Sequence, residues 1–164
     1  MLLASTGSPS VWCYGVGTLK VTAKIKSATC SIDINGEENA SVSLPAVKTS
    51  DFPKAGVVGT GVTVKMNFKN CDDVAAVSYM ITPAKLIPGD SSTVAATGGD
   101  AKNIGFKIYN NLGGLMNFES GVYKSTSTRA MTSSLTNRIQ YYSTGSPVLA
   151  GTVKTTLIYS IDYP

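Results

Sequence analysis

The three cysteines, Cys13, Cys30 and Cys71, are the residues of this 164-residue chain whose chemistry is best defined. Cys30 and Cys71 each follow a segment in which apolar and polar residues alternate, so a disulfide between them would join the ends of two strands. This bridge would close a loop of about 40 residues and stabilise the fold by about 4 kcal/mol in the chain-entropy model. It would also indicate an oxidising compartment such as the bacterial periplasm. The alternative, two buried free thiols in a cytosolic protein, stays open at this point.

Side chains that carry catalysis or bind metals are scarce. The chain contains no histidine, which excludes Ser-His-Asp and Cys-His catalysis and every zinc site that needs an imidazole. Asp72 and Asp73 are adjacent, so on a strand their carboxylates would point to opposite faces, and a solvated turn explains them better than a calcium site. The glycines of segment 56–61 do not form a phosphate-binding motif and are typical of a flexible loop. We therefore predict no enzyme, no metal and no cofactor.

The charge pattern bears on the partners. Fourteen Lys and Arg residues against ten Asp and Glu residues give a net charge of +4, but only Arg129 and Arg138 are arginines and the lysines are scattered. Nucleic-acid-binding proteins usually cluster these cations with aromatic residues on one face, so we expect no nucleic-acid partner. No apolar run approaches the length that spans a bilayer. Residues 1–16 differ from the rest of the chain and are expected to be a leader or an extension, with Cys13 unpaired or removed.

The chain elements that must position any site are strands. Val, Thr, Ser, Gly and Tyr are frequent, and a helical period is missing. Segment 151–163 alternates most regularly, and one face of it carries Val153, Thr155, Leu157, Tyr159, Ile161 and Tyr163. Because the sequence ends at Pro164, we expect an earlier segment or a strand of another protein to cover its open edge.

Other alternating segments lie at the spacing of an immunoglobulin-like sandwich. They begin near Leu19, Val42, Val62, Val74, Ile104 and Arg138. Segments 48–61 and 83–102 and the Ser/Thr-rich stretch before Arg138 are expected to be loops. We see no repeats and no domain linker.

In order along the chain, several of these segments resemble the structural pilins of chaperone–usher (type 1-like) fimbriae. The matching pieces are 17–25 ahead of Cys30, 42–47, 52–56, 64–71, 101–108, a glycine fourteenth from the end (Gly151) and a penultimate tyrosine (Tyr163). Two features depart from the family pattern. Ala23 stands where the family often has glycine, and the segment before Gly17 is longer than usual and carries an extra cysteine.

This resemblance implies an all-β fold, an incomplete immunoglobulin-like sandwich that lacks its final strand. A donor strand from a chaperone, and later from another subunit, would complete it by strand addition. The implied pilin domain covers 17–164, and 17–26 is its donor-strand segment. The donor stripe would consist of Gly17, Leu19, Val21, Ala23 and Ile25. The groove strand that binds the chaperone would present Gly151, Val153, Leu157, Tyr159, Ile161 and Tyr163.

The function that follows is a structural subunit of an adhesive surface fimbria that polymerises by donor-strand exchange. Its expected partners are neighbouring pilins, a periplasmic chaperone and an outer-membrane usher, with a host glycan or cell surface as a further candidate. Its expected route leads through the periplasm to the cell surface. The alternative is a minor tip subunit or an adhesin that binds glycans. The adjacent Tyr141 and Tyr142 are candidate glycan contacts for it, but we expect them to pack in the core.

Overall fold

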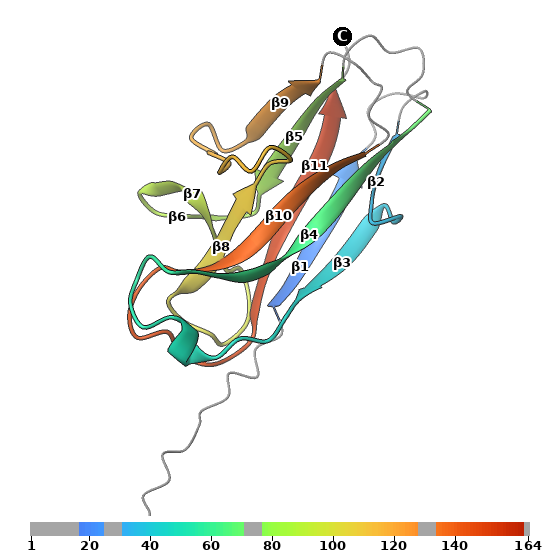
Figure 1. Ribbon diagram of the computed structural model, residues 1–164. Helices are drawn as coiled ribbons and strands as arrows, with labels where there is room; N and C mark the ends of the chain where they lie inside the picture. The colour runs from blue at the N-terminus through green and yellow to red at the C-terminus, as the bar shows by residue number, and fades with distance from the viewer. Residues whose placement is uncertain (1–16, 25–30, 71–76, 128–133, 163–164) are drawn as a thin grey trace, which may run out of the picture.

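The computed structural model describes residues 17–24, 31–70, 77–127 and 134–162 as two stacked β-sheets (Figure 1). The strands are β1 (Gly17–Lys24), β2 (Ser31–Ile34), β3 (Asn39–Leu44), β4 (Val58–Lys69), β5 (Val77–Pro83), β6 (Leu86–Ile87), β7 (Asp90–Ala95), β8 (Ile104–Tyr109), β9 (Tyr123–Ser127), β10 (Ser134–Ser143) and β11 (Val153–Asp162). A 3₁₀ turn, η1 (Thr49–Asp51), lies between β3 and β4. The predicted all-β fold class is confirmed.

The sheets have different strand orders. One sheet has five strands in the order β3-β1-β11-β5-β9, and the other has six in the order β2-β4-β10-β8-β7-β6. In Figure 1 the strands β4 and β10 lie in front of β1 and β11, so the six-stranded sheet faces the viewer. We expected either an earlier segment or a strand of another protein to cover the open edge of segment 151–163. In this structure earlier segments do so, because β11 pairs with β1 on one side and with β5 on the other.

One apolar core fills the space between the sheets. Its largest fully buried side chains include Tyr79, Tyr141, Tyr159, Phe106, Phe118, Leu19, Met66 and Ile108. The Tyr141 ring stacks on Phe106 with centroids 5.9 Å apart and meets Phe52 edge-on at 6.5 Å. Tyr141 is therefore a packing residue and not a surface contact for a glycan.

Three segments that we predicted as loops contain strands. Strand β4 already begins at Val58, the pair β6–β7 forms a hairpin inside the predicted loop 83–102, and β9 lies in the Ser/Thr-rich stretch. Their alternation is hidden because they are short or rich in Ser and Thr. Their pairing with β10, β8 and β5 is a long-range contact that a local pattern cannot reveal.

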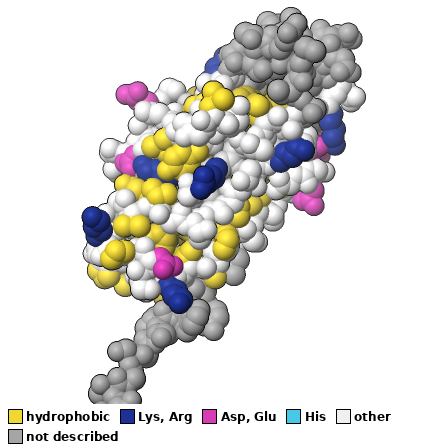
Figure 2. Space-filling model, viewed as in Figure 1, with side chains coloured by type: hydrophobic (Ala, Val, Ile, Leu, Met, Phe, Trp, Pro, Cys, Tyr) yellow, Lys and Arg dark blue, Asp and Glu magenta, His cyan; other side chains and the backbone are white. Residues whose placement is uncertain are grey.

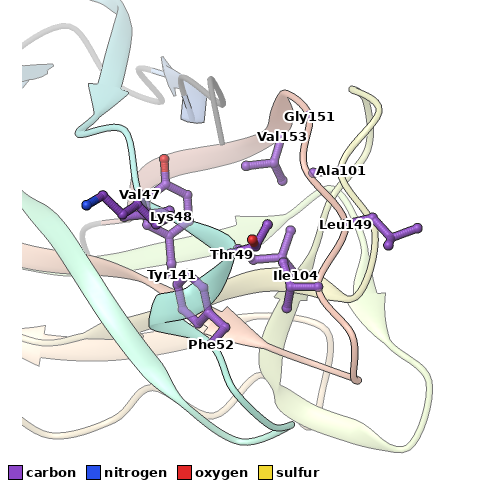
Figure 3. A pocket seen from close by; sticks show the side chains of 11 residues that line it. Val47, Lys48, Thr49, Phe52, Ala101, Ile104, Tyr141, Leu149, Gly151 and Val153 are labelled. Atoms are coloured by element: carbon purple, nitrogen blue, oxygen red, sulfur yellow. The ribbon is translucent and has the colours of Figure 1, made fainter. Parts of the chain in front are cut away.

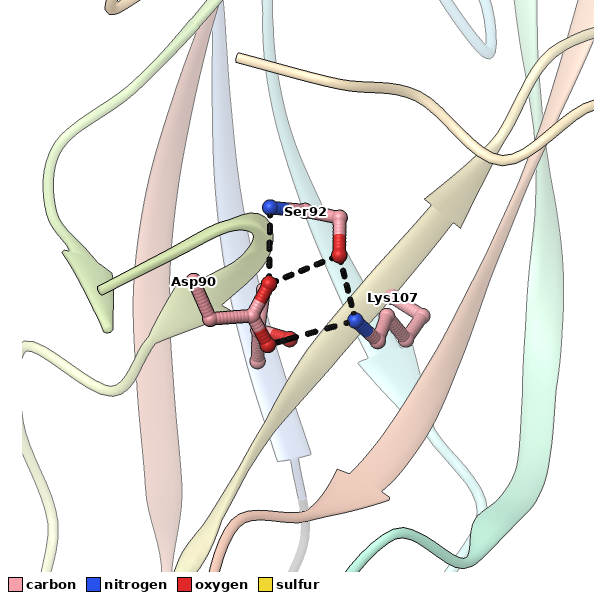
Figure 4. A network of polar contacts seen from close by, with 4 residues as sticks. Asp90, Ser92 and Lys107 are labelled. Atoms are coloured by element: carbon pink, nitrogen blue, oxygen red, sulfur yellow. Dashed lines mark hydrogen bonds and ion pairs between the residues drawn. The ribbon is translucent and has the colours of Figure 1, made fainter. Parts of the chain in front are cut away.

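A network of polar side chains joins the start of β7 to β8 (Figure 4). The Asp90 carboxylate accepts hydrogen bonds from the Ser92 backbone N–H (2.9 Å), from the Ser92 and Thr93 hydroxyls and from Lys107 Nζ (3.4 Å). Partial burial alone would raise the pKa of Asp90, but the bonds from Thr93 and Ser92 and the charge of Lys107 outweigh it and hold this pKa well below its usual range. Lys107 Nζ also lies 4.4 Å from the centroid of the Tyr142 ring. The network fixes the outer end of the six-stranded sheet.

Candidate functional site

The position of β1 is the feature of this fold that most directly bears on function. Strand β1 lies between β3 and β11, antiparallel to β3 and parallel to β11. Its register against β11 runs from Gly17 opposite Val153 to Lys24 opposite Ser160. Adjacent strands of an immunoglobulin-like sandwich are normally antiparallel, so a first strand that pairs in parallel with the last is a departure from that pattern. We call the site between β3 and β11 the insertion groove, and in this chain β1 fills it.

Apolar side chains of β1 point into the insertion groove. Leu19 and Val21 are fully buried, each with 0% of its surface exposed, and Gly17 is buried beside them. On the opposite face Lys20 is exposed and Thr18 is half-buried. This is the alternation expected for a strand with one face in the core.

Two members of the predicted donor stripe are less completely described. The backbone of Ala23 pairs with Tyr159, and Ile25 lies outside the described residues. The structure thus places Gly17, Leu19 and Val21 together in the chain's own core. Whether the stripe also acts on a neighbouring molecule stays a prediction.

The inner face of β11 forms one wall of the insertion groove. Its buried side chains are Val153, Thr155, Leu157, Tyr159 and Ile161. Tyr163 lies outside the described residues, and the chaperone contact predicted for this face remains a prediction.

Gly151 precedes β11, which begins two residues later than we predicted. A Cβ atom at Gly151 would lie 2.5 Å from the Ala101 nitrogen and 2.7 Å from the Asp100 carbonyl carbon. A side chain at this position would therefore push the neighbouring backbone away, so the close approach of segment 100–101 requires glycine here.

Polar groups hold the inner face of β11 from within the core. The Thr155 hydroxyl donates to the Ala95 carbonyl oxygen (2.9 Å), and Asn137 Nδ2 donates to the Tyr159 hydroxyl (3.3 Å). Burial raises the pKa of Tyr159, so its hydroxyl stays neutral. The sequence pattern places Thr155 on this face but does not reveal its hydrogen-bond partner. We did not predict Asn137 as a core residue, because an asparagine on a strand is usually exposed to solvent.

The start of β1 is held by a hydrogen bond to the opposite sheet. The Gly17 N–H donates to the Tyr141 hydroxyl oxygen across 3.0 Å in a buried setting. A small cavity of about 10 Å³, room for about one water molecule, lies beside this contact and is lined in part by Tyr141, Val153 and Leu149 (Figure 3). A Cβ atom at Gly17 would overlap the Tyr141 hydroxyl. Glycine at this position is therefore required by the close approach of Tyr141.

We expect Gly17→Val to destabilise the chain by about 1–3 kcal/mol, because the new side chain must displace a fully packed Tyr141 ring. For a chain of this size each kcal/mol lowers the melting temperature by about 2–4 °C. Thermal unfolding followed by circular dichroism measures the effect. Thr18→Val, on the half-buried outer face, is the matched control and is expected to change little. A Gly17→Val chain that melts with the parent would show that Tyr141 does not hold the start of β1.

Other kinds of site find no support among the described residues. Within the ranges that the structure describes, no group of three or more His, Cys, Asp or Glu residues is placed to hold a metal ion. A search of the same ranges finds no helix with the length and apolar character needed to cross a membrane. Cys13, Cys30 and Cys71 lie outside them, so the Cys30–Cys71 disulfide stays a prediction that peptide mass spectrometry without reduction would decide.

Comparison with known proteins agrees with this geometry. The chain is 26% identical over 175 residues to a type-1 fimbrial protein subunit of Serratia marcescens, covering 99% of this chain and 94% of the relative. Among solved structures, the P pilus rod subunit PapA superposes with a TM-score of 0.61 at 17% identity, over 84% of this chain and 92% of PapA. An antigen and type I fimbria protein of Burkholderia pseudomallei gives a TM-score of 0.53 at 16% identity, over 89% and 94% of the two chains. These two structures support the fold.

The family assignment rests on the match to a family model. The model of the family described as fimbrial protein matches residues 19–164, which is nearly all of the described chain. Proteins of this family are subunits of cell-surface fimbriae and polymerise with other subunits. The family is structural and not enzymatic. The chain therefore belongs to the fimbrial protein family.

Proposed function

We propose that this chain is a structural subunit of an adhesive fimbria and that it polymerises by donor-strand exchange. In this proposal a periplasmic chaperone first inserts a strand into the insertion groove, and an outer-membrane usher then helps an incoming subunit to replace it. The donor is the 17–26 segment of the incoming subunit, within a pilin domain that covers 17–164. The groove strand is β11 with its inner face and Tyr163.

The observation that carries the proposal is the insertion of β1 beside β11. A segment near the start of the chain occupies the place where the sandwich would otherwise need a strand after β11. Its alternating side chains match the groove, since Leu19 and Val21 are completely buried. A groove that accepts this segment from its own chain is also suited to the same segment from a second copy.

Strand direction gives a physical reason for exchange. Parallel pairing is slightly less stable per residue than antiparallel pairing. Within one chain β1 pairs with β11 in parallel. A strand from another molecule is free to enter in the antiparallel direction, with better hydrogen-bond geometry to β11. Main-chain bonds would then supply the affinity and the alternating side chains the register.

Co-purification of two forms of the chain tests this proposal. A tagged chain with Leu19→Ser and Val21→Ser keeps its insertion groove but loses the two side chains that fill it. When it is co-expressed in the periplasm with untagged parent chain, we expect it to bind parent copies through their 17–26 segments. Native mass spectrometry of the tagged fraction would detect these mixed complexes.

The matched control carries Thr18→Ser and Lys20→Ser on the outer face of the same strand. It should fill its own groove and bind no more parent chain than a tagged parent does. Strand exchange is contradicted if the Leu19→Ser, Val21→Ser chain is recovered without parent copies, whether as a folded monomer or as aggregate.

A further inference from the structure

A polar recess on the outer face of the six-stranded sheet lies apart from the insertion groove. It has a volume of about 390 Å³ and is bounded by β10 and by the turn that follows β8. Thr63, Tyr109, Asn111, Thr136, Arg138 and Gln140 contribute to its lining. Figure 2 is viewed from the side of this sheet and shows Lys and Arg side chains scattered over the face, among hydrophobic, acidic and uncharged surface. The recess is within the size range of small-molecule sites.

The wall formed by the turn is internally hydrogen-bonded. Asn110 Oδ1 accepts from the backbone N–H groups of Leu112 (3.0 Å) and Gly114 (2.8 Å), and the Asn110 N–H donates to the Gly114 carbonyl oxygen (2.8 Å). Asn110 Nδ2 also donates to the Tyr123 hydroxyl (3.2 Å). Because Asn110 ties the turn together and anchors it to β9, the wall is preorganised and does not have to be ordered by a ligand.

The floor of the recess presents polar groups that no other side chain uses. Among the described residues, the Arg138 guanidinium has neither an ion-pair partner nor a hydrogen-bond acceptor, and it is exposed. Its neighbour Gln140 donates through Nε2 to the Gly59 carbonyl oxygen (2.9 Å), which leaves Oε1 as an acceptor. The hydroxyls of Thr63 and Thr136 and the amide of Asn111 likewise have no partner in the described part of the chain. Neutral donors and acceptors thus surround one cation.

We propose that this recess binds an acidic saccharide, a sugar ring that carries a carboxylate. Arg138 would bind the carboxylate through two parallel, charge-assisted hydrogen bonds, the bidentate arrangement that the planar guanidinium favours. The amides of Asn111 and Gln140 and the two threonine hydroxyls match the mixed donors and acceptors of sugar hydroxyls. The half-buried Tyr109 adds an aromatic surface beside Arg138, its register partner on β8. The lining contains no carboxylate that would repel the ligand.

An acidic peptide is a poorer match for the recess. Peptides that bind a sheet usually add to an open edge and use its free main-chain groups. Strand β10 pairs with β4 along nearly all of its length and with β8 from Arg138 to Ser143, so only residues 134–137 lack a sheet partner on the β8 side. This stretch is short for strand addition, so a compact ligand held by side chains, such as a single sugar ring or a disaccharide, is the better match for the recess.

Titration of the full chain with single sugars, followed by amide chemical shifts, tests the proposal. N-acetylneuraminic acid and glucuronic acid are the acidic probes. Methyl galactoside tests the contribution of the sugar ring without a charge, and acetate tests the contribution of the carboxylate without a sugar. We expect saturable shifts around Asn111, Arg138 and Gln140 with an acidic probe, and affinity at least tenfold weaker for methyl galactoside and for acetate. The preferred acidic probe distinguishes sialylated host glycans from uronate-containing polysaccharides.

Two variants separate the recess from general charge. Arg138→Gln removes an exposed side chain, so the fold should persist, and it should weaken binding by about 10–100-fold. The control is Lys65→Gln. Lys65 is exposed and lies opposite Thr136 on β4, so its loss removes a nearby cation and should weaken binding less than twofold.

The proposal is overturned if no acidic sugar binds, if acetate or methyl galactoside binds as tightly, or if a glutamate-rich peptide binds more tightly. It is equally overturned if Arg138→Gln binds like the parent. These measurements use the monomer, so their failure would leave strand exchange untouched.

Discussion

Deletion of residues 1–24 is expected to abolish the cooperative thermal unfolding of this chain. The deletion removes Leu19 and Val21, which are fully buried between the sheets, and exposes the edges of β3 and β11 that pair with β1. Burial of one such aliphatic side chain is worth about 1.5–3 kcal/mol. Together with the exposed groove walls the loss is comparable to a whole domain stability of about 5–15 kcal/mol. Circular dichroism and dye binding to exposed apolar surface would measure it.

A synthetic peptide of residues 17–26 is the complementing partner in this experiment. Added to the shortened chain, it should restore a sharp transition, because it brings back the side chains that fill the groove. A peptide with Leu19→Ser and Val21→Ser is the control and should restore nothing. A shortened chain that melts like the parent would show that β1 is dispensable to the fold.

Moving the strand to the other end of the chain should raise stability and stop polymerisation together. We expect this of a chain that lacks residues 1–24 and carries a copy of residues 17–26 after Pro164, joined by a flexible Gly/Ser linker. The relocated copy can fold back antiparallel to β11, the more stable pairing direction. Each kcal/mol gained would raise the melting temperature by about 2–4 °C. The same chain has no free N-terminal segment to donate, so electron microscopy should find no fibres where the parent assembles.

The control for this relocation is the same fusion with Leu19→Ser and Val21→Ser in the appended copy. It should melt far below the relocated chain, because a linker and a backbone alone do not fill the groove. Fibre formation by the relocated chain at the parent's yield would contradict the proposal that the 17–26 segment is the donor.

The alternating strands were the part of this fold that local sequence could predict. The inward face of β11 and the pair Leu19 and Val21 follow from period-two patterning, since one buried face imposes it. Strand β6 was missed because it is only two residues long, and β7 and β9 were missed because Ser and Thr conceal the period. In addition, β7 pairs with β8 and β9 pairs with β5, neighbours that a local pattern does not reveal. The parallel pairing of β1 with β11 was equally inaccessible, because a strand pattern specifies a face and not a neighbour.

The residues at close contacts between distant segments were hardest to predict, for a different reason. The dipeptide Tyr141-Tyr142 left two possibilities, a glycan contact or, as we expected, packing in the core. The structure buries Tyr141 and leaves Tyr142 half-buried, a difference that depends on which face of the strand each occupies. Gly17 and Gly151 were selected through family resemblance. Their physical reasons, the approach of the Tyr141 hydroxyl and of the Ala101 backbone, are contacts more than 40 residues apart in the chain and are visible only in three dimensions.

The insertion of β1 into its own groove sets a concentration scale for assembly. Strand β1 ends at Lys24 and β2 begins at Ser31, so a short tether keeps the strand close to its groove. A connection of a few residues gives effective concentrations on the order of millimolar. An incoming strand at micromolar concentration must therefore overcome roughly a thousandfold advantage of the resident one, about 4 kcal/mol. A fibre can grow from dilute subunits only if the intermolecular pairing is that much stronger, or if another protein keeps the groove from closing on its own strand.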